Sequence, residues 1–224
     1  MSRLYRIGYD VPFEPFGVLE QGKPSGMLIE LTDHLLTCAG MAHEFQSMTL
    51  AETEGALFSG RVDALAFKGV TADRLKTMIF SDPLIVSGAA TFTRAGALPQ
   101  PDLGSYTGKT LVTPKKGPMW AQIERNHPTI TLVDGDSYEG SFTALLDGRA
   151  DVAALNLHAG IAIANRLFPD KVACSKTPYT PLAISFAIAP SGPAELVSAI
   201  NRELAIAKSD GTWQRIHDRW MRRE

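Results

Sequence analysis

Residues 56–66 read ALFSGRVDALA, and residues 144–154 return to the same pattern as ALLDGRADVAA. In each copy a predicted helix reaches a glycine, Gly60 or Gly148, and glycine commonly supplies the left-handed residue that ends a helix. A short apolar run follows without alternation of polar and apolar residues, which is typical of a strand buried on both faces. Helix, glycine and buried strand therefore occur twice, and the chain is predicted to contain two similar α/β lobes.

A capping pattern marks the start of each predicted helix. Thr49 precedes the first helix with Glu52 three residues later, and Asp136 precedes the second with Glu139 three residues later. An oxygen-bearing side chain followed by glutamate at this spacing is the pattern of a capped helix N-terminus. The two helices are therefore predicted to begin just after Thr49 and Asp136.

The remaining elements follow from hydrophobic periodicity and from the positions of glycine and proline. Helices are predicted over residues 27–38, 118–126, 159–167 and 193–220, the last broken at 210–211, and strands over residues 6–9, 45–48, 89–93, 110–113, 129–133, 171–174 and 184–189. Lobe 1 is expected to comprise residues 1–91 plus 187–224, and lobe 2 residues 92–186. Two strands then connect the lobes as a hinge. Because ligands of open α/β sheets lie beyond the carboxyl ends of the strands, function is expected just after Phe67 and Leu155.

The composition excludes several classes of partner and site. With 22 basic and 24 acidic residues the net charge is −2, and no basic run is longer than Lys115-Lys116. Neither nucleic acid nor an anionic membrane is therefore expected as a partner. The five histidines are scattered, and Asp134 and Asp136 lack the further ligands of a calcium loop, so no metal and no cofactor are predicted.

The sequence also bears on the cellular compartment. No apolar stretch approaches the ~20 residues of a membrane span, and residues 4–9 form a predicted strand in place of a signal peptide. The protein is therefore expected to be either cytosolic or secreted with its signal removed. Cys38 and Cys174 fall in different lobes, where a disulfide would prevent relative motion, and both are expected to be reduced and buried.

Several segments carry a family resemblance. Residues 10–16 read DVPFEPF, Glu30 follows Gly26, residues 57–63 read LFSGRVD, residues 71–74 read TADR, residues 80–83 read FSDP, and residues 209–213 read SDGTW. In this order and at these spacings they resemble the periplasmic solute-binding proteins of polar amino-acid importers, family 3 of the bacterial extracellular solute-binding proteins. The likeness runs over nearly the whole chain.

The resemblance implies the type II, or Venus flytrap, fold, in which each lobe holds a mixed, mostly parallel sheet flanked by helices. It implies a monomer that captures a small carboxylate-bearing solute, an amino acid or related organic acid, in a cleft between the lobes. The solute would be delivered to the membrane permease of an ABC importer, without catalysis. The implied compartment is the periplasm, reached by means of a signal peptide that is later removed.

The resemblance places the solute's carboxylate at Arg74. A guanidinium can clamp a carboxylate with two parallel hydrogen bonds, a geometry that lysine does not reproduce. The alternative is a surface arginine that forms a modest salt bridge with Asp73 or Asp82. Thr71, at the start of the same short helix, would add its hydroxyl or backbone N–H.

Two further ligand residues are implied by the same segments. Phe13 stands where an aromatic ring stacks on the ligand, and its alternative role is as part of the hydrophobic core. Gly69 precedes the TADR segment and is included among the ligand-binding residues.

Three departures from the family pattern concern the ligand. Asn156 stands where the family has an aspartate that pairs with the ligand's ammonium, and an amide brings no charge to offset desolvation. Gly117 and Pro118 replace a Gly-Thr or Gly-Ser helix entry, and proline removes both a hydroxyl and an N–H donor. Lys68 replaces a small residue and is expected to be solvated, or else to place a cation beside Arg74. A ligand that carries a carboxylate, with or without an amino group, is predicted.

Two alternative functions remain open at this stage. The fold also resembles that of the cyclohexadienyl and arogenate dehydratases, but such an enzyme needs a general acid and no carboxylate stands at Asn156. The sensing domain of a receptor kinase would have the same internal sequence, and flanking transmembrane segments would distinguish it. His158, two residues beyond Asn156, is expected to be a structural hydrogen-bonding residue.

Overall fold

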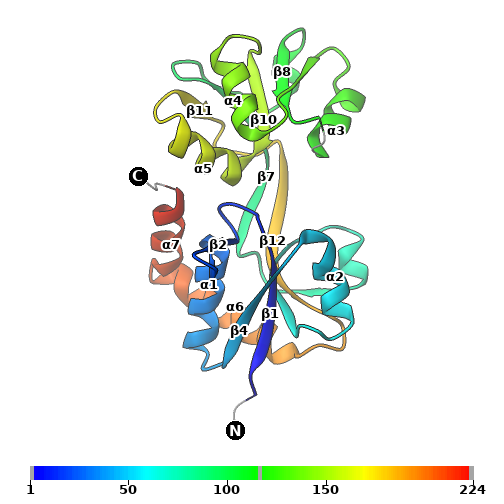
Figure 1. Ribbon diagram of the computed structural model, residues 1–224, viewed down its shortest axis with the longest axis vertical. Coiled ribbons are helices and arrows are strands. Elements are labelled where there is room, and N and C mark those ends of the chain that lie inside the picture. Colours follow the sequence, from blue (N-terminus) through cyan, green and yellow to red (C-terminus); the bar gives the residue numbers. More distant parts are fainter. Residues whose placement is uncertain (1–2, 116–117, 222–224) are drawn as a thin grey trace. The chain divides into compact units, whose positions relative to one another are not determined.

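The computed structural model describes residues 3–115 and 118–221, shown as a ribbon in Figure 1. These residues form a mixed α/β protein, as predicted. They divide into two compact units, of which the first holds residues 3–86 and Leu182–Trp220 and the second holds Ser87–Pro181. Within the described ranges, no helix is both long and apolar enough to cross a membrane.

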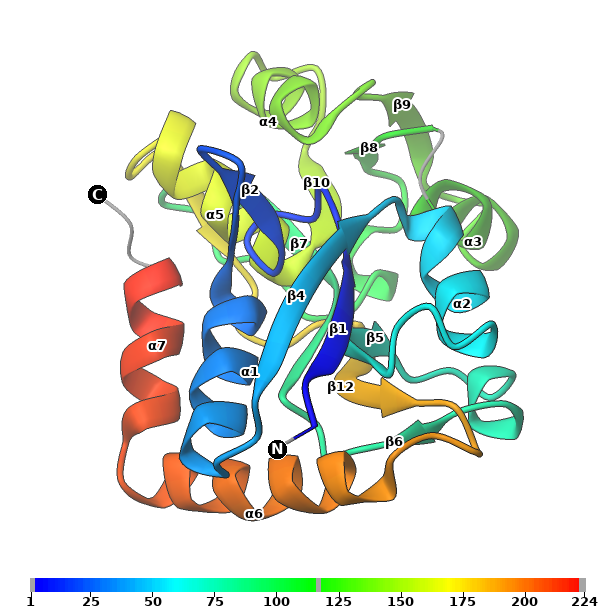
Figure 2. The same cartoon turned by 60° about the horizontal axis from the view of Figure 1, so that its bottom comes forward.

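The first unit is built from the strands and helices at the two ends of the chain. Its elements are β1 (Tyr5–Asp10), β2 (Val18–Glu20), β3 (Lys23–Ser25), α1 (Met27–Cys38), β4 (His43–Met48), α2 (Leu50–Phe58), β5 (Ala64–Gly69), a 3₁₀ helix (Arg74–Lys76), β6 (Ile79–Phe80), β12 (Thr180–Ile188), α6 (Ala194–Ser209) and α7 (Thr212–Met221). The strand order is β4-β1-β5-β12, with β6 also paired to β12. β4, β1 and β5 are parallel, and β12 is antiparallel to β5 (Figure 2).

Apart from Met221, the second unit is continuous in sequence. Its elements are β7 (Ile85–Arg94), a 3₁₀ helix (Gly104–Tyr106), β8 (Thr110–Thr113), α3 (Pro118–Asn126), β9 (Thr131–Asp134), α4 (Tyr138–Leu146), β10 (Val152–Asn156), α5 (Leu157–Leu167) and β11 (Val172–Cys174). The strand order is β7-β10-β8-β9, with β11 also paired to β7. β10, β8 and β9 are parallel, and β7 is antiparallel to β10.

The two units share one connectivity. In the first unit α1 joins β1 to β4 and α2 joins β4 to β5, and in the second α3 joins β8 to β9 and α4 joins β9 to β10. In the first unit β4 and β5 therefore lie on opposite sides of β1, and in the second unit β9 and β10 lie on opposite sides of β8. The sheet then has a topological switch point, between β1 and β5 in the first unit and between β8 and β10 in the second, where ligands of such sheets bind.

Both copies of the sequence repeat form the predicted helix, glycine and strand. They give α2 and β5 in the first unit, and α4 and β10 in the second. Gly60 and Gly148 have φ angles of 73° and 77° and follow the last residues of the two helices. Thr49 caps α2 as predicted, and its backbone N–H donates to Glu52 Oε2 at 2.8 Å.

The cap of α4 differs by one residue from the prediction. Ser137, not Asp136, is the N-cap, and its hydroxyl oxygen accepts from the Gly140 N–H at 3.0 Å. An N-cap residue needs extended backbone, which Ser137 has with φ −141° and ψ 177°. Asp136 has φ 58° and lies in the preceding turn.

Each unit has a hydrophobic core of its own. In the first, α1 buries Leu28, Leu31, Leu35 and Leu36, each at most 2% exposed, at the spacing of one helix face. In the second, Phe92 and Phe142 are fully buried, with ring centroids 5.4 Å apart in an edge-to-face arrangement. Burial was wrongly predicted for one cysteine, because Cys38 is exposed at the end of α1, whereas Cys174 is half-buried.

Gly88 allows a close backbone approach within the second unit. Its φ is 129°, and a Cβ atom there would lie 1.9 Å from the Thr180 carbonyl oxygen. We expect Gly88→Ala to destabilise the protein by about 2 kcal/mol, because both the left-handed backbone and the overlap are costly. Urea unfolding followed by the fluorescence of Trp120, on α3 of the same unit, measures this loss.

Gly96→Ala is the matched control for that variant. Gly96 also has positive φ, 90°, but a Cβ atom there would have nothing within 4 Å. Alanine there adds only the backbone strain, about 1 kcal/mol. Equal losses in the two variants would mean that the approach to Thr180 has no energetic consequence.

Candidate functional site

The switch point of the first unit carries two buried charges. Asp10 is the last residue of β1 and Lys68 is the next-to-last residue of its parallel neighbour β5. They are 5% and 4% exposed, and the Lys68 ammonium donates to Thr53 Oγ1 at 2.6 Å. The prediction that Lys68 is solvated is therefore wrong. The long side chain of Lys68 reaches α2 in place of solvent.

Burial shifts the pKa of both charged groups away from the charged form. It raises the pKa of the Asp10 carboxyl, an effect opposed by the positive charges of Lys68 and Arg74. It lowers the pKa of the Lys68 ammonium, an effect opposed mainly by the negative charge of Asp10. Each group therefore offsets part of the desolvation cost of the other.

Arg74 stands beside these charges and already has protein partners. Its Nε donates to Glu54 Oε1 at 2.9 Å, and Nη2 lies 2.9 Å from the same oxygen. Nη1 donates to the Gly69 carbonyl at 3.1 Å. A guanidinium has five N–H groups, so two remain for a ligand after these three contacts. Its side chain is 28% exposed, which leaves one side of the group accessible.

The ion pair of Arg74, with Glu54, is not one of the two pairs that were considered as the alternative to ligand binding. Asp73, one of two acidic residues considered from the sequence, pairs with Lys76 at 2.8 Å. Glu54 lies on α2, 20 residues before Arg74. The residues close to Arg74 in sequence therefore gave no sign that Glu54 is its partner. Asp10, Glu54, Lys68 and Arg74 together carry two negative and two positive charges. Any anion that binds Arg74 therefore meets a locally balanced cluster.

The other predicted residues of the first unit lie around Arg74 and β5. The Thr71 hydroxyl oxygen accepts from the Arg74 backbone N–H at 3.3 Å, as expected at the start of the 3₁₀ helix. Gly69 ends β5, and a Cβ there would lie 3.0 Å from Leu182 Cδ2. Phe13 is half-buried, 4.9 Å from the ring of Phe16 between centroids. Its ring also lies 6.2 Å from that of Phe67 between centroids, so Phe13 contacts the core and is only partly accessible.

Asn156 ends β10 at the switch point of the second unit and caps α5. Its Oδ1 accepts from the backbone N–H groups of His158 at 3.1 Å and Ala159 at 3.2 Å. The Ser87 hydroxyl, fully buried on β7, donates to the same oxygen at 3.2 Å. His158 is 5% exposed and its Nδ1 lies 2.9 Å from Ser87 Oγ. Its predicted structural role agrees with this contact.

Three hydroxyl groups extend this polar region of the second unit. The Tyr138 hydroxyl oxygen accepts from the Asn156 backbone N–H at 3.2 Å. Tyr179 is close enough to Tyr138 that the two hydroxyls interact electrostatically. The Tyr179 hydroxyl and that of Thr113, the last residue of β8, are buried without a hydrogen-bond partner among the described residues.

The predicted helix entry of the second unit is only partly described. Gly117 lies outside the described residues, and α3 begins at Pro118, where helix formation was predicted. Proline suits the first turn of a helix because its missing N–H has no partner there in any case.

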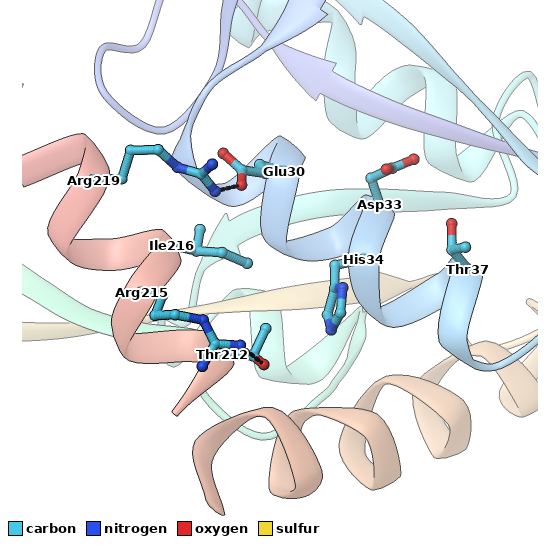
Figure 3. A pocket seen from close by; sticks show the side chains of 8 residues that line it. All are labelled: Glu30, Asp33, His34, Thr37, Thr212, Arg215, Ile216 and Arg219. Atoms are coloured by element: carbon cyan, nitrogen blue, oxygen red, sulfur yellow. Dashed lines mark hydrogen bonds and ion pairs between the residues drawn. The ribbon is translucent and has the colours of Figure 1, made fainter. Parts of the chain in front are cut away.

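A separate groove in the first unit runs between α1 and α7 (Figure 3). Its volume is about 610 Å³, and Glu30, Asp33, His34, Thr37, Thr212, Arg215, Ile216 and Arg219 line it. Glu30 accepts from the Trp220 ring N–H at 2.8 Å and from Arg219, and Arg215 donates to Thr212 Oγ1 at 2.6 Å. The two contacts of Glu30 join α7 to α1, whereas the Arg215 contact lies within α7. None of the predicted ligand residues that the structure describes lines the groove. Among the residues that the structure describes, no cluster of three or more potential metal ligands occurs.

Five polar residues of these regions were not predicted from the sequence, namely Asp10, Glu54, Thr113, Ser87 and Tyr179. Asp10 and Thr113 each end the first of the three parallel strands of a unit, β1 or β8. The rule that was applied after Phe67 and Leu155 would have found them if it had been applied to all the parallel strands. Glu54, Ser87 and Tyr179 come from neighbouring elements, and no spacing in the sequence indicated their contacts.

Comparisons with known proteins agree with the architecture. The model of the family "Bacterial extracellular solute-binding proteins, family 3" matches residues 5–223. The ABC transporter glutamine-binding protein of Bacillus subtilis is 23% identical over 184 residues, which cover 81% of this chain and 66% of that protein. The virulence sensor protein BvgS of Bordetella bronchiseptica is 25% identical over 163 residues, 72% of this chain but only 13% of the sensor. The chain thus spans less than two thirds of these curated relatives.

Among solved structures, the L-cystine solute receptor of Neisseria gonorrhoeae in its unliganded open conformation superposes with a TM-score of 0.83. The sequences are 20% identical, and the match covers 97% of this chain and 92% of the receptor. This likeness shows a shared fold, the type II fold of periplasmic binding proteins.

Proposed function

We propose that this chain, which belongs to family 3 of the bacterial extracellular solute-binding proteins, captures a small carboxylate-bearing solute, an amino acid or related organic acid, for ABC-type import. The observation that carries the proposal is the partly exposed guanidinium of Arg74 at the β1–β5 switch point, with two N–H groups left for a ligand. The relatives named as binding proteins of ABC transporters support it. Capture requires no catalytic step and no cofactor.

Each predicted residue has a role in this proposal. Arg74 binds the solute's carboxylate, Thr71 and Gly69 shape the backbone around it, and Phe13 offers the accessible part of its ring to the solute. Lys68, buried behind them, adds positive charge to the site without reaching the solute. In the second unit, Asn156 and the helix entry at Gly117 and Pro118 are proposed to contact the same solute.

The family description as extracellular supports capture in the periplasm and handover to a membrane permease. The protein is proposed to act as a monomer there. A pull-down of detergent-solubilised permease with solute-loaded protein tests this part of the proposal. Retention that does not depend on solute would contradict delivery.

The experiment that tests solute capture is a thermal-shift screen with amino acids, 2-oxo acids, 2-hydroxy acids and dicarboxylates. A solute present at a hundredfold its Kd adds about 2.7 kcal/mol to the free energy of unfolding. At least one carboxylate is expected to raise the Tm, while the matching amide or ester has no effect. A screen in which no carboxylate raises the Tm contradicts the proposal.

A second candidate function is solute sensing. BvgS is named a virulence sensor, and a histidine kinase sensor domain superposes with a TM-score of 0.70 at 25% identity over 98% of this chain. Binding of the solute would be the same in both cases. The coding sequence on either side of residues 1–224 decides between them, since a sensor requires an adjoining membrane-spanning segment and kinase region.

A further inference from the structure

We infer that the end of β10 in the second unit receives a hydrogen-bond acceptor of the solute and rejects an ammonium group. The solute is therefore a carboxylic acid with an oxo group, a hydroxyl or a second carboxylate where an α-amino acid carries its amino group. The inference rests on the proposed function and narrows its solute class.

The first step is the orientation of the Asn156 side chain. The oxygen and nitrogen of an amide are told apart by their hydrogen-bond partners. Here the backbone N–H groups of His158 and Ala159 point at one atom of the amide, at 3.1 and 3.2 Å. Both are donors at a helix N-terminus, so the atom that they contact is Oδ1, as at other asparagine N-caps. Nδ2 therefore points away from α5.

The second step is that Asn156 Oδ1 cannot accept a further hydrogen bond from the solute. A carbonyl oxygen has two lone pairs, and Oδ1 already meets three donors, the third being the Ser87 hydroxyl at 3.2 Å. The same hydroxyl also makes a hydrogen bond with Nδ1 of His158, at 2.9 Å. This chain of two side chains, both nearly fully buried, fixes the amide against rotation.

The third step is the character of the tyrosine hydroxyl groups of this polar region. The Tyr138 hydroxyl oxygen accepts from the Asn156 backbone N–H at 3.2 Å, so its proton is directed elsewhere. The Tyr179 hydroxyl, whose pKa is raised partly by the charge of ionised Tyr138, is buried and has no hydrogen-bond partner among the described residues. Burial raises the pKa of both hydroxyls, so both keep their protons at neutral pH.

Asn156 Nδ2 and the hydroxyl of Tyr138, which contacts the Asn156 backbone, are thus donors at the end of β10. A solute oxygen matches them, whereas an ammonium group would bring further N–H groups against N–H and O–H groups. A buried polar group left without a partner is unfavourable, and more so when it is charged. An aspartate at this position would keep one oxygen on the cap and turn the other outward as an acceptor. The exchange of one atom, nitrogen for oxygen, therefore changes which solute is bound.

The test compares acids that share a carbon skeleton. Calorimetric titrations of the purified protein would use three pairs, pyruvate with alanine, malate with aspartate, and 2-oxoglutarate with glutamate. For the pair that fits the site, the acid without nitrogen is expected to bind at least about tenfold more tightly, the factor that corresponds to 1.4 kcal/mol. In Asn156→Asp the preference is expected to reverse.

Two controls separate this effect from others. Asn156→Asp keeps the helix cap, because aspartate and asparagine are equivalent N-caps, so the variant is expected to retain its Tm without solute. Asn126→Asp adds the same charge at an exposed position on α3 of the same unit and is expected to leave the preference unchanged.

The outcomes distinguish this inference from the proposed function. Tighter binding of the amino acid in the unsubstituted protein, or a preference that Asn156→Asp leaves unchanged, overturns the inference while solute capture stands. If neither member of any pair binds, and no other carboxylate does, the proposed function fails and this inference fails with it.

Discussion

Replacing Arg74 with alanine is expected to weaken the binding of any carboxylate solute about 30-fold or more. The reason is the loss of a charge-assisted hydrogen-bonded pair, which is worth about 2 kcal/mol or more. The substitution is expected to change the free energy of unfolding only slightly, because the ion pair with Glu54 is partly exposed, and such pairs contribute at most about 1 kcal/mol. Titration calorimetry with the solute found in the screen measures the change in Kd.

Three further variants make the Arg74 experiment specific. Lys76→Ala removes an exposed cation from the same 3₁₀ helix and should leave the Kd unchanged. Arg74→Lys keeps the charge without the planar fork and should recover only part of the affinity. Glu54→Gln removes the anion that competes for the guanidinium, so carboxylates should bind more tightly. An unchanged Kd in Arg74→Ala would exclude Arg74 from the site.

Lys68→Met is expected to reduce the free energy of unfolding by about 3 kcal/mol at pH 7. The methionine fits the buried stem, but the substitution removes the positive charge that acts most strongly on the buried Asp10 carboxylate and leaves only Arg74. A buried charge that loses its partner is strongly destabilising. Urea unfolding followed by the fluorescence of Trp213 and Trp220, both on α7 of the first unit, measures the loss. The double variant Asp10→Asn/Lys68→Met removes both charges and should recover most of it.

The loss in Lys68→Met should also depend on pH. The pKa of Asp10 is raised in the folded state, so the folded protein is favoured below the ordinary pKa of the carboxyl, about 3.9, and this advantage is lost as pH rises through the folded-state pKa. The difference between the unsubstituted protein and Lys68→Met should therefore shrink from pH 7 toward pH 4. A difference independent of pH would show that Asp10 is not the group that loses its partner.

The sequence predicted the repeated helix–glycine–strand unit because each part has a local cause. A capping pair at Thr49 and Glu52, a left-handed glycine at Gly60 and an unbroken apolar run each act within a few residues. The same local rules failed at Asp136, where the neighbouring Ser137 offered an equally suitable oxygen in the right backbone conformation. The hairpin of β2 and β3 was not predicted, because each of its strands has only three residues, too few to show a periodic pattern.

The candidate site was less predictable, because its interactions join distant positions. Lys68 resembles a surface lysine in the sequence, and only the position of Thr53 on α2 and of Asp10 on β1 explains its burial. The partner of Arg74 likewise comes from a different element. The departure at Asn156 was visible in the sequence, but the direction of its amide depended on α5 and Ser87. The roles of the predicted ligand residues remain predictions until solute binding is measured.

The discontinuity of the first unit has a consequence for synthesis on the ribosome. Its strand β12 and helix α6, which complete the sheet beside β5 and cover α1, are made last, after the whole of the second unit. At about 5–20 residues per second, that delay is on the order of 5–20 seconds. The second unit can fold in that time, whereas the apolar side of α1 waits for its cover. The nascent chain therefore passes through a state in which the half-built first unit exposes hydrophobic surface and is open to chaperones or to aggregation.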